Sequence, residues 1–283
     1  MRSFLILLVL SFSAAAGYAQ DTLRIMSFNI RYDNPSDGIY SWTQRKEMVF
    51  DVFRMEMPHL VGLQEVLQNQ EDDLLRALPG YLTFGAGRDD GFDKGEHALI
   101  LYDSARFQRM NGSTFWLSEH PGDPGSISWK SACTRIVTWA KFRDRLTQED
   151  IFFFNTHFDH ISRKARVKSA ELLMDSIARI AGTNKAIITG DFNADKSEKT
   201  YRLIITRKQP LMLDSRSIAL KRSGPESTFV GFPAVFEQPT CIDFIFLSEG
   251  RDVKVLSYRV GDYNIDGQYP SDHLPVVVQV LKF

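Results

Sequence analysis

The sequence predicts one domain of the α/β or α+β class, and three observations indicate it. Short apolar runs typical of β-strands recur along the chain. Amphipathic helical patterns interrupt these runs, so strands and helices are mixed rather than segregated. No internal repeat and no Pro/Gly-rich linker divides the chain, whose 283 residues can bury one substantial core. We therefore expect a single domain over residues 20–283.

Eight segments have the composition of short strands, because they are either continuously apolar or alternate apolar and polar residues. The expected strands cover residues 23–30, 59–63, 97–102, 135–142, 151–156, 186–189, 242–247 and 275–281. Segment 223–238 instead carries Gly and Pro at close spacing. It is expected to form an irregular loop or hairpin over a cleft.

Three segments have helical periodicity. Residues 41–57 direct their apolar side chains toward one face, and Pro58 ends the pattern. Residues 163–181 follow Ser162, which is expected to cap the helix, and repeat apolar residues at helical spacing. A shorter helix is expected to begin near Ser197.

Residues 1–19 have the pattern of a signal peptide. Arg2 provides a positive start, residues 4–12 form an apolar stretch, and residues 17–19 offer a cleavage site before Gln20. The alternative, a membrane anchor, is disfavoured because the apolar run is too short to span a bilayer. We expect a mature chain that is secreted or periplasmic. Removal of Arg2 with the leader changes the formal net charge from −1 to −2.

Charge and cysteine content limit the classes of function. The 34 Lys and Arg residues nearly balance the 35 Asp and Glu residues, so no general basic surface is expected to hold an extended duplex nucleic acid. We do not expect stable insertion into a membrane. We expect the protein to be a monomer. Cys133 and Cys241 each lie in a strand-like apolar run, where two free thiols are favoured over a disulfide.

Polar residues gather where the expected strands end. Taken singly, an Asp after a Gly is most often a turn former, and a His near a strand end is most often structural. A carboxylate inside an apolar run is harder to explain, since a buried charge needs a partner. Because open α/β folds build sites at strand ends, the segments are expected to converge in one cleft. They are Ser27-Phe28-Asn29, Leu63-Gln64-Glu65, Asn155-Thr156-His157, Gly190-Asp191-Phe192-Asn193, Ile242-Asp243-Phe244 and Ser271-Asp272-His273.

The strings SFNIR, GLQEV, NTHFDH, GDFNAD, CIDFIF and SDHLPV occur in this order along nearly the whole mature chain. As an ordered set they resemble the signatures of the endonuclease/exonuclease/phosphatase superfamily, in the form of a secreted bacterial-type member nearest the deadenylase-like branch. The resemblance implies a four-layer sandwich, in which two mixed β-sheets pack face to face with helices outside. It also implies hydrolysis of phosphate esters at one end of the sandwich.

The resemblance implies a metal side and a water side of that site. Glu65 would be the main metal carboxylate, with Asn29 beside it. Hard oxygen ligands suit Mg²⁺ or Mn²⁺ rather than Zn²⁺. Asp191 would activate the attacking water, and Asn193 would orient water and phosphate.

Four further residues take supporting roles by the same resemblance. His157 and His273 would donate hydrogen bonds to phosphoryl oxygens, which carry much of the transition-state charge. Asp243 would hold the catalytic side chains in register. Asp272 would be an additional metal-side carboxylate or a group that orients a catalytic His.

Two positions have an equally ordinary structural interpretation. Glu96 resembles the acid that supports the first catalytic His, but a surface Glu in a Gly-rich loop is an alternative. Arg135 resembles an Arg that binds the phosphate, but could be a routine charge at a strand edge. Arg88, His160 and Arg166 lie near the motifs and could form a substrate rim.

The substrate is expected to be a small or short phosphate ester. A phosphodiesterase or exonuclease-like activity ranks first, and a phosphomonoesterase acting on a small sugar or nucleotide phosphate ranks second. A non-catalytic binding protein on the same fold is a third interpretation, disfavoured because the motif residues are all present.

Overall fold

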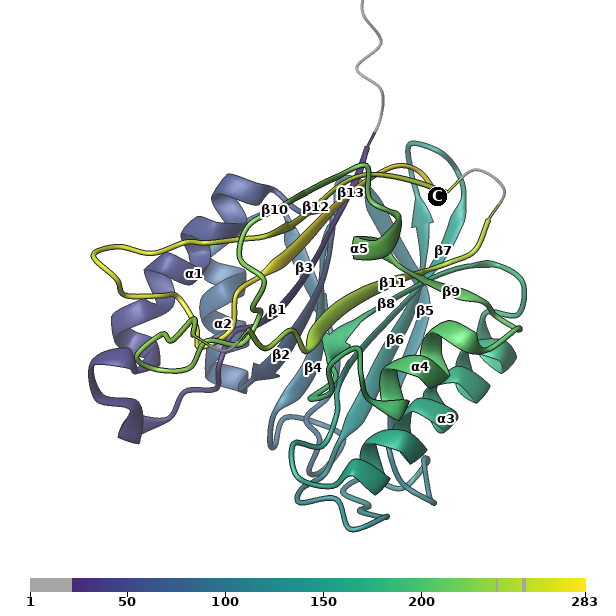
Figure 1. Cartoon of the computed structure of the whole chain (residues 1–283), viewed down its shortest axis with the longest axis horizontal. Helices are drawn as coiled ribbons and strands as arrows, with labels where there is room; N and C mark the ends of the chain where they lie inside the picture. The colour runs from purple at the N-terminus through teal and green to yellow at the C-terminus, as the bar shows by residue number, and fades with distance from the viewer. Residues whose placement is uncertain (1–21, 238, 251–252) are drawn as a thin grey trace, which may run out of the picture.

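The chain folds into two β-sheets that pack face to face between two layers of helices. The computed structural model describes residues 22–237, 239–250 and 253–283, so the expected leader at 1–19 lies outside the described residues. Within these residues, one sheet has seven strands in the order β10-β12-β13-β1-β2-β4-β3, and the other has six in the order β5-β6-β7-β8-β11-β9. Both sheets mix parallel and antiparallel pairs. The predicted four-layer sandwich is therefore confirmed (Figure 1).

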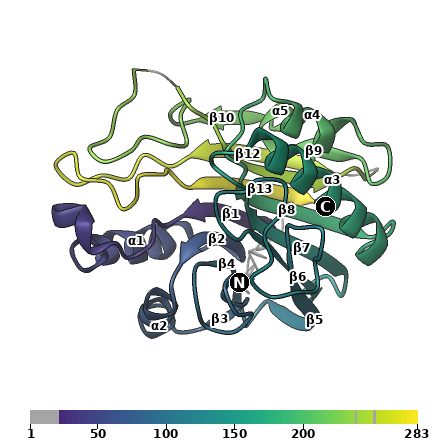
Figure 2. The same cartoon turned by 90° about the horizontal axis from the view of Figure 1, so that it is seen from below.

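The strands of the seven-stranded sheet are β1 (Leu23–Asn29), β2 (Leu60–Val66), β3 (Tyr81–Phe84), β4 (His97–Asp103), β10 (Lys221–Ser223), β12 (Lys254–Val260) and β13 (Val276–Lys282). Their labels follow one another across the molecule in Figure 2. The six-stranded sheet contains β5 (Phe107–Trp116), β6 (Ile136–Asp144), β7 (Asp150–His157), β8 (Lys185–Asp191), β9 (Met212–Asp214) and β11 (Asp243–Ser248). The helices are η1 (Pro35–Tyr40), α1 (Trp42–Glu56), α2 (Gln68–Ala77), α3 (Arg163–Ile180), α4 (Lys199–Thr206) and α5 (Ser215–Ile218).

Three apolar layers hold the sandwich together. The middle layer, between the sheets, includes Ile25, Phe153 and Ile245. A second layer packs α1 against the outer face of β1 and β2, and a third packs α3 and α4 against β7, β8 and β11. Each central strand is consequently apolar on both faces, which explains its nearly continuous apolar sequence.

Strand direction brings the polar strand ends together. β1 and β2 are parallel and pair Asn29 with Gln64, so both strands finish at the same end of the sheet. In the other sheet, β7 and β8 are parallel and pair His157 with Asp191. β11 runs antiparallel to β8 and begins at this end, with Asp243 opposite Asp191.

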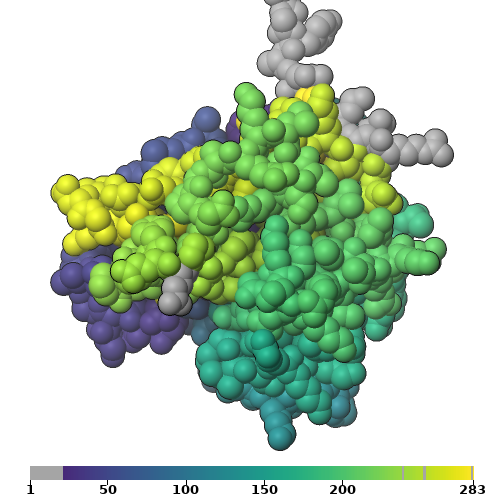
Figure 3. Space-filling model, viewed as in Figure 1, coloured from purple at the N-terminus to yellow at the C-terminus, as the bar shows by residue number. Residues whose placement is uncertain are grey.

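Most expected elements are present, with shifts of a residue or two at their ends. The two long helices are α1 and α3, and the Ser162 side chain accepts a hydrogen bond from Ala165 N, as expected of a cap. Segment 224–237 forms neither helix nor strand, as predicted. In the space-filling view, green and yellow late segments cover the purple early segments on one face (Figure 3). The ring stack of Tyr40 on Phe232, with centroids 4.6 Å apart, is one such contact.

Several elements were not predicted: η1, α2, β3, β5, β9, β10, β12 and α5. β5 buries only its first and last residues, Phe107 and Trp116, so no continuous apolar run marks it. β12 contains a bulge between Val255 and Ser257, which breaks the alternation that a regular strand would show. α2 is largely polar and buries only Gln70 and Leu74.

A buried arginine joins the loops at the end where the polar strand ends meet. Arg45 of α1 is 2% exposed and donates hydrogen bonds to the main-chain oxygens of Ile30, Arg31 and Pro270, among others. These contacts tie the chain after β1 to the loop that carries Asp272. Burial lowers the pKa of Arg45 to about 10, against the raising effect of Asp272 and other carboxylates.

Among the described residues, no helix is long and apolar enough to cross a bilayer. Cys133 and Cys241 are both free thiols.

Candidate active site

Glu65 lies at the end of β2 in an unusual backbone conformation. Its φ is 62°, in the left-handed region that a side chain other than Gly or Asn rarely adopts. A register shift between Leu63 and Val66 accompanies it. The carboxylate accepts hydrogen bonds from Asn29 Nδ2 at 3.1 Å and from Tyr32 N at 3.1 Å. Strain of this kind is typical of functional sites, where the surrounding contacts hold a residue in place.

Asn29 connects the two halves of the site. Its Nδ2 lies 3.1 Å from Glu65 Oε1 and 3.1 Å from Asp191 Oδ2, and its Oδ1 accepts a hydrogen bond from Arg31 N at 3.0 Å. A single amide therefore bridges the carboxylate of the first sheet to that of the second. The side chain is fully buried, behind the surface that a ligand would touch.

His273 lies between two aspartates. Its Nδ1 is 2.9 Å from Asp243 Oδ2, and its Nε2 is 3.5 Å from Asp191 Oδ2. Burial disfavours the imidazolium, but Asp243 and Asp191 outweigh it and raise the pKa of His273 well above its ordinary value. Asp243 is thus the residue that orients His273. His273 makes no such hydrogen bond with Asp272. The Oδ1 of Asp272 instead accepts a hydrogen bond from Ser271 Oγ at 3.2 Å.

Asp191 has the electrostatic environment of a base. Burial and repulsion from Asp243 raise its pKa to about 7, while His273 and a hydrogen bond from Asn193 N oppose the shift. The protonated and the ionised forms of the Asp191 carboxyl group are therefore both populated near neutral pH. Asn193, with φ of 46°, places its side chain beside Asp191 and His157.

His157 is the neutral histidine of the site. Burial first, and then the nearby charge of Arg135, lower its pKa well below the ordinary value. Its Nε2 lies 3.0 Å from Asn193 Nδ2, which also donates to Phe158 O. Acceptance at Nε2 leaves the proton on Nδ1, and that buried atom has no hydrogen-bond partner in the part of the chain that the structure describes. The nearest carboxylate is that of Glu96, whose Oε2 lies 4.0 Å from this Nδ1.

Two arginines share one carboxylate beside His157. Arg88 Nη1 donates to Glu96 Oε2 at 2.6 Å, and Arg135 Nη1 lies 3.8 Å from the same oxygen. Burial raises the pKa of Glu96, which Arg88 and Arg135 counteract. The wall is positive when Glu96 is ionised, since two guanidinium groups face one carboxylate.

These groups enclose a cavity of about 480 Å³. It is lined by Arg31, Tyr32, Glu65, Arg88, Glu96, Cys133, Arg135, His157, His160, Asp191, Asn193, Phe229, Ile242, Asp272 and His273. Eight of the predicted site residues therefore line one cavity: Glu65, Glu96, Arg135, His157, Asp191, Asn193, Asp272 and His273. The other two, Asn29 and Asp243, contact this set from behind.

Some residues of the cavity wall were not identified from the sequence, and Arg166, one candidate for a substrate rim, lies elsewhere. Arg31 and Tyr32 were not expected, although Arg31 belongs to the SFNIR string. Arg31 pairs with Asp37 at 3.0 Å and lies 3.9 Å from Glu65. Arg166 does not reach the cavity, because it is buried and bound to Glu198.

The residues present fit a hard divalent cation. Burial is the largest cause that raises the pKa of Asp191 and of Asp272, and repulsion from neighbouring carboxylates adds to it. Asp243 Oδ1 is buried with no hydrogen-bond partner among the described residues. Asp191, Asp243 and His273 bring their ligand atoms within 4.8 Å of one another, a spacing that a metal could use, but His273 Nδ1 already pairs with Asp243 Oδ2. Glu65 and Asp272 add further carboxylate oxygens to the cavity lining, clear of that pair. Oxygen donors of this kind favour Mg²⁺, Mn²⁺ or Ca²⁺ over softer metals.

A model of a known protein family matches the part of the chain that contains the candidate site. The model of the Endonuclease/Exonuclease/phosphatase family matches residues 26–273, a range that contains every predicted site residue. An endonuclease/exonuclease/phosphatase from Bacteroides vulgatus is 38% identical, with a TM-score of 0.87 over 92% of this chain and 98% of that one.

Two further proteins differ in what their names say they do. A mannosyl-6-phosphatase from Bacteroides thetaiotaomicron is 34% identical over 91% of this chain and 99% of that chain, with a TM-score of 0.84. A probable RNA exonuclease from Schizosaccharomyces pombe is 23% identical over 69% of this chain and 40% of its own length.

Proposed function

Because this chain belongs to the Endonuclease/Exonuclease/phosphatase family, we propose that it is a divalent-metal-dependent hydrolase of small phosphate esters. One observation carries the proposal. The lining of a cavity of about 480 Å³ combines two carboxylates with raised pKa values, those of Asp191 and Asp272, with the guanidinium groups of Arg31, Arg88 and Arg135. A metal and a phosphate together would satisfy both kinds of group.

The metal would be held by Glu65, with Asn29 beside it and Asp272 nearby. When bound, Mg²⁺ or Mn²⁺ would neutralise charge on the phosphoryl oxygens and make a bound water more acidic. Asp191 would accept a proton from the attacking water, a role that suits its pKa of about 7. Asn193 would orient that water through its contact beside Asp191.

The two histidines would act as donors in different protonation states. Neutral His157 would donate from Nδ1, and protonated His273 would donate from Nε2. Asp243 would keep His273 charged and fixed in orientation. Both donors would reach oxygens on which negative charge develops, where an added hydrogen bond lowers the barrier most.

We propose a phosphate monoester, such as a small sugar phosphate, as the substrate. The sequence alone ranks a phosphodiester first. The similarity to a mannosyl-6-phosphatase, which extends over 99% of that chain at 34% identity, favours the monoester. An exonuclease-like phosphodiesterase is the second candidate, supported by the weaker similarity to a probable RNA exonuclease. The presence of every motif residue disfavours a non-catalytic binding protein.

Hydrolysis of matched esters tests the proposal. Purified protein would be offered sugar 6-phosphates, nucleoside monophosphates, a dinucleotide and a short oligonucleotide, each with Mg²⁺, with Mn²⁺ and with EDTA. We expect metal-dependent release of inorganic phosphate from a sugar phosphate and little cleavage of the oligonucleotide. Asp191→Asn serves as the inactive control.

Two results would contradict the proposal in different ways. Faster cleavage of the oligonucleotide than of any monoester would favour the second candidate. No hydrolysis of any ester with either metal, at protein concentrations where the metal is shown to bind, would favour the non-catalytic interpretation.

We also propose that the protein is exported, on the pattern of residues 1–19. Intact-mass measurement on exported protein should give a mature chain that starts near Gln20. Retention of Met1 in the soluble protein would contradict export by cleavage.

A further inference from the structure

One buried carboxylate fixes the loop that follows β7. Asp159 Oδ2 accepts hydrogen bonds from Ser131 Oγ at 3.0 Å and Ala132 N at 2.8 Å. Its Oδ1 accepts from Ile161 N at 3.1 Å and Ser162 N at 2.5 Å. Although burial opposes them, these bonds lower the pKa of Asp159, so the carboxylate stays ionised. The loop after β7 is thereby tied to the loop before β6.

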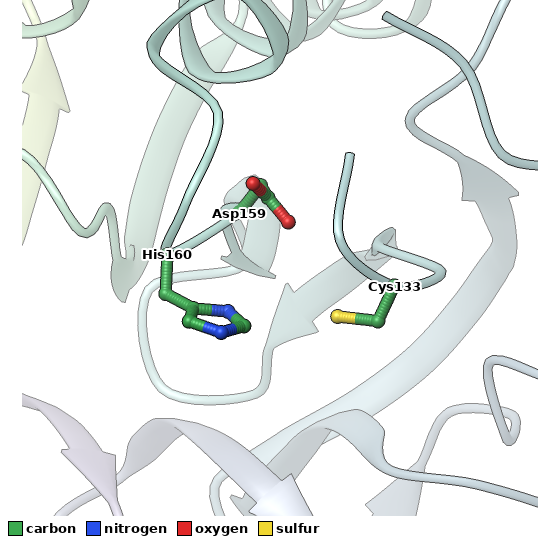
Figure 4. Close-up of side chains that lie close together, drawn as sticks. All are labelled: Cys133, Asp159 and His160. Carbon is green, nitrogen blue, oxygen red and sulfur yellow. The ribbon is translucent and has the colours of Figure 1, made fainter. Parts of the chain in front are cut away.

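This connection places Cys133 and His160 next to each other on the cavity wall. Figure 4 shows the Cys133 thiol directed toward the imidazole, and the ligand atoms of Cys133, Asp159 and His160 lie within 4.8 Å of one another. The group is poorly suited to a metal, because each oxygen of Asp159 already accepts two hydrogen bonds. His160 Nδ1 moreover faces a guanidinium group. The position of His160 beside the cavity therefore needs an explanation other than metal binding.

His160 instead holds Arg135. The Nη2 of Arg135 lies 3.2 Å from His160 Nδ1. Because an arginine keeps all its protons, it donates and Nδ1 accepts, which leaves the imidazole proton on Nε2. Arg135 is only 6% exposed, and its Nε and Nη1 have no hydrogen-bond partner in the described part of the chain. Glu96 Oε2, 3.8 Å from Nη1, is too far away to form a hydrogen bond with it.

Buried guanidinium donors without partners point to an anionic ligand. Leaving such donors unpaired is costly, and a phosphate oxygen would satisfy them from the cavity side. A phosphate monoester has three non-bridging oxygens, whereas a diester has two. The metal side and the two catalytic histidines can serve two of these oxygens, and Arg135 lines the same cavity.

On the proposed function, we infer that His160 is a positioning residue that aims Arg135 at the third non-bridging oxygen of a phosphate monoester. The Arg135–His160 pair then determines the preference for monoesters over diesters. A diester carries an esterified oxygen at this place, which bears less charge and cannot use the guanidinium fully.

Two substitutions at His160 separate positioning from simple structure. His160→Asn keeps an acceptor close to the position of Nδ1, and His160→Phe keeps the ring but removes the acceptor. For His160→Phe we expect KM for the monoester, and the inhibition constant of inorganic phosphate, to rise about tenfold, the scale of one lost charged hydrogen bond. The rate on the matched diester should change about twofold or less, and His160→Asn should recover most of the monoester preference. His120→Phe, on an exposed loop residue that does not line the cavity, is the matched control.

Arg135→Lys completes the test. If His160 acts through Arg135, His160→Phe should have little further effect in the Arg135→Lys protein. Equal losses on monoester and diester, or a His160→Asn protein that behaves like His160→Phe, would overturn the inference. If the wild-type protein hydrolyses neither ester, the proposed function fails. Binding of inorganic phosphate to the Mg²⁺-loaded protein, measured by calorimetry, then decides: equal affinity in wild type and His160→Phe would also overturn the role of His160.

Discussion

At the scale of single residues, the site gives side chains of the same type different pKa values. His157 and His273 both lie in the buried end of the cavity, yet the pKa of the first is well below the ordinary value and that of the second well above it. Burial lowers the pKa of both histidines, and Arg135 lowers that of His157 further, whereas Asp243 and Asp191 outweigh burial at His273. A neutral donor and a charged donor are thus available together.

Asp191 and Glu65 are both carboxylates, but their proposed roles, base and metal ligand, predict different effects of mutation. Asp191→Asn keeps the size of the side chain but removes the basic oxygen, so kcat should fall by at least about a hundredfold. Metal affinity should change little. Glu65→Ala should weaken the metal, with partial recovery of activity in excess Mn²⁺. Metal titration by calorimetry alongside kcat checks both, and equal loss of metal binding in the two proteins would place Asp191 in the metal shell.

At the scale of elements, the two sheets approach closely where polar side chains replace apolar ones in the middle layer. Gln64 Nε2 donates to Asn155 Oδ1 at 2.7 Å, and Thr189 Oγ1 lies 3.1 Å from the same oxygen. Gly62 leaves the space for them. A Cβ there would collide with Thr189 Oγ1 and with the Asn155 carboxamide.

Gly62→Ala should accordingly lower the free energy of unfolding by about 2–3 kcal/mol, the usual cost of overfilling a packed interior. Gly122→Ala is the control, because a Cβ at Gly122 meets nothing within 4 Å. Urea titration should show a lower midpoint for Gly62→Ala alone. A Gly62→Ala protein as stable as the control would mean that the sheets separate without cost.

A second element-level feature lies at the opposite end of β2. Burial, then the charges of Arg106 and Arg24, lower the pKa of His59 to about 4. Its Nδ1 is 3.0 Å from Arg24 N and 3.2 Å from Arg106 Nη1. The folded protein therefore keeps this imidazole neutral at pH values where the unfolded chain protonates it.

This shift predicts a loss of stability with acid. The unfolded chain takes up a proton below about pH 6.5 and the folded chain only near pH 4, so stability falls as the pH drops between these values. After allowance for solvent around a partly exposed ring, the contribution of His59 should be about 1 kcal/mol. His59→Gln should lose less stability than the wild type between pH 7 and pH 4 in urea titrations. Parallel curves for the two proteins would contradict the assignment.

Whether the sequence predicts an element depends on how distinct its pattern of apolar residues is. Strands that are apolar on both faces, such as β8, were predictable because a short continuous apolar run is typical of a buried strand. β5 and β12 were not, since exposure hides the first and a bulge disturbs the second. The convergence of polar strand ends could be expected. That Asp243 rather than Asp272 contacts His273 depends on the register of β11 against β8, which no local pattern encodes.

At the scale of the whole molecule, positive and negative charges are nearly balanced. The 34 Lys and Arg residues stand against 35 Asp and Glu residues. Positive charge near the cavity comes from a few arginines, and Arg88 and Arg135 already contact Glu96. A long polyanion would find few further contacts beyond the site.

The dependence on salt should therefore be shallow. A protein that contacts many phosphates loses about 10³–10⁵ in affinity between about 50 and 200 mM salt. Here we expect no more than about tenfold in apparent affinity over that range, because one or two phosphates engage the site. Activity on a monoester and on a short oligonucleotide, titrated against NaCl, would measure this. A steep slope with tight binding to long duplex DNA would restore an endonuclease.

The antiparallel pairing of β1 with β13 has a consequence for how the molecule can be held. Leu23 lies opposite Val280, whereas Asn29 and His273 belong to the end with the cavity. Both termini of the described chain thus leave from the far side, a strand length of about 20 Å away. A carrier bead or surface attached through Phe283 would have the opening facing outward. The tethered enzyme should keep the kcat/KM of the free one toward a small ester, and access for a bulky substrate would be limited by the rim of the opening rather than by the support.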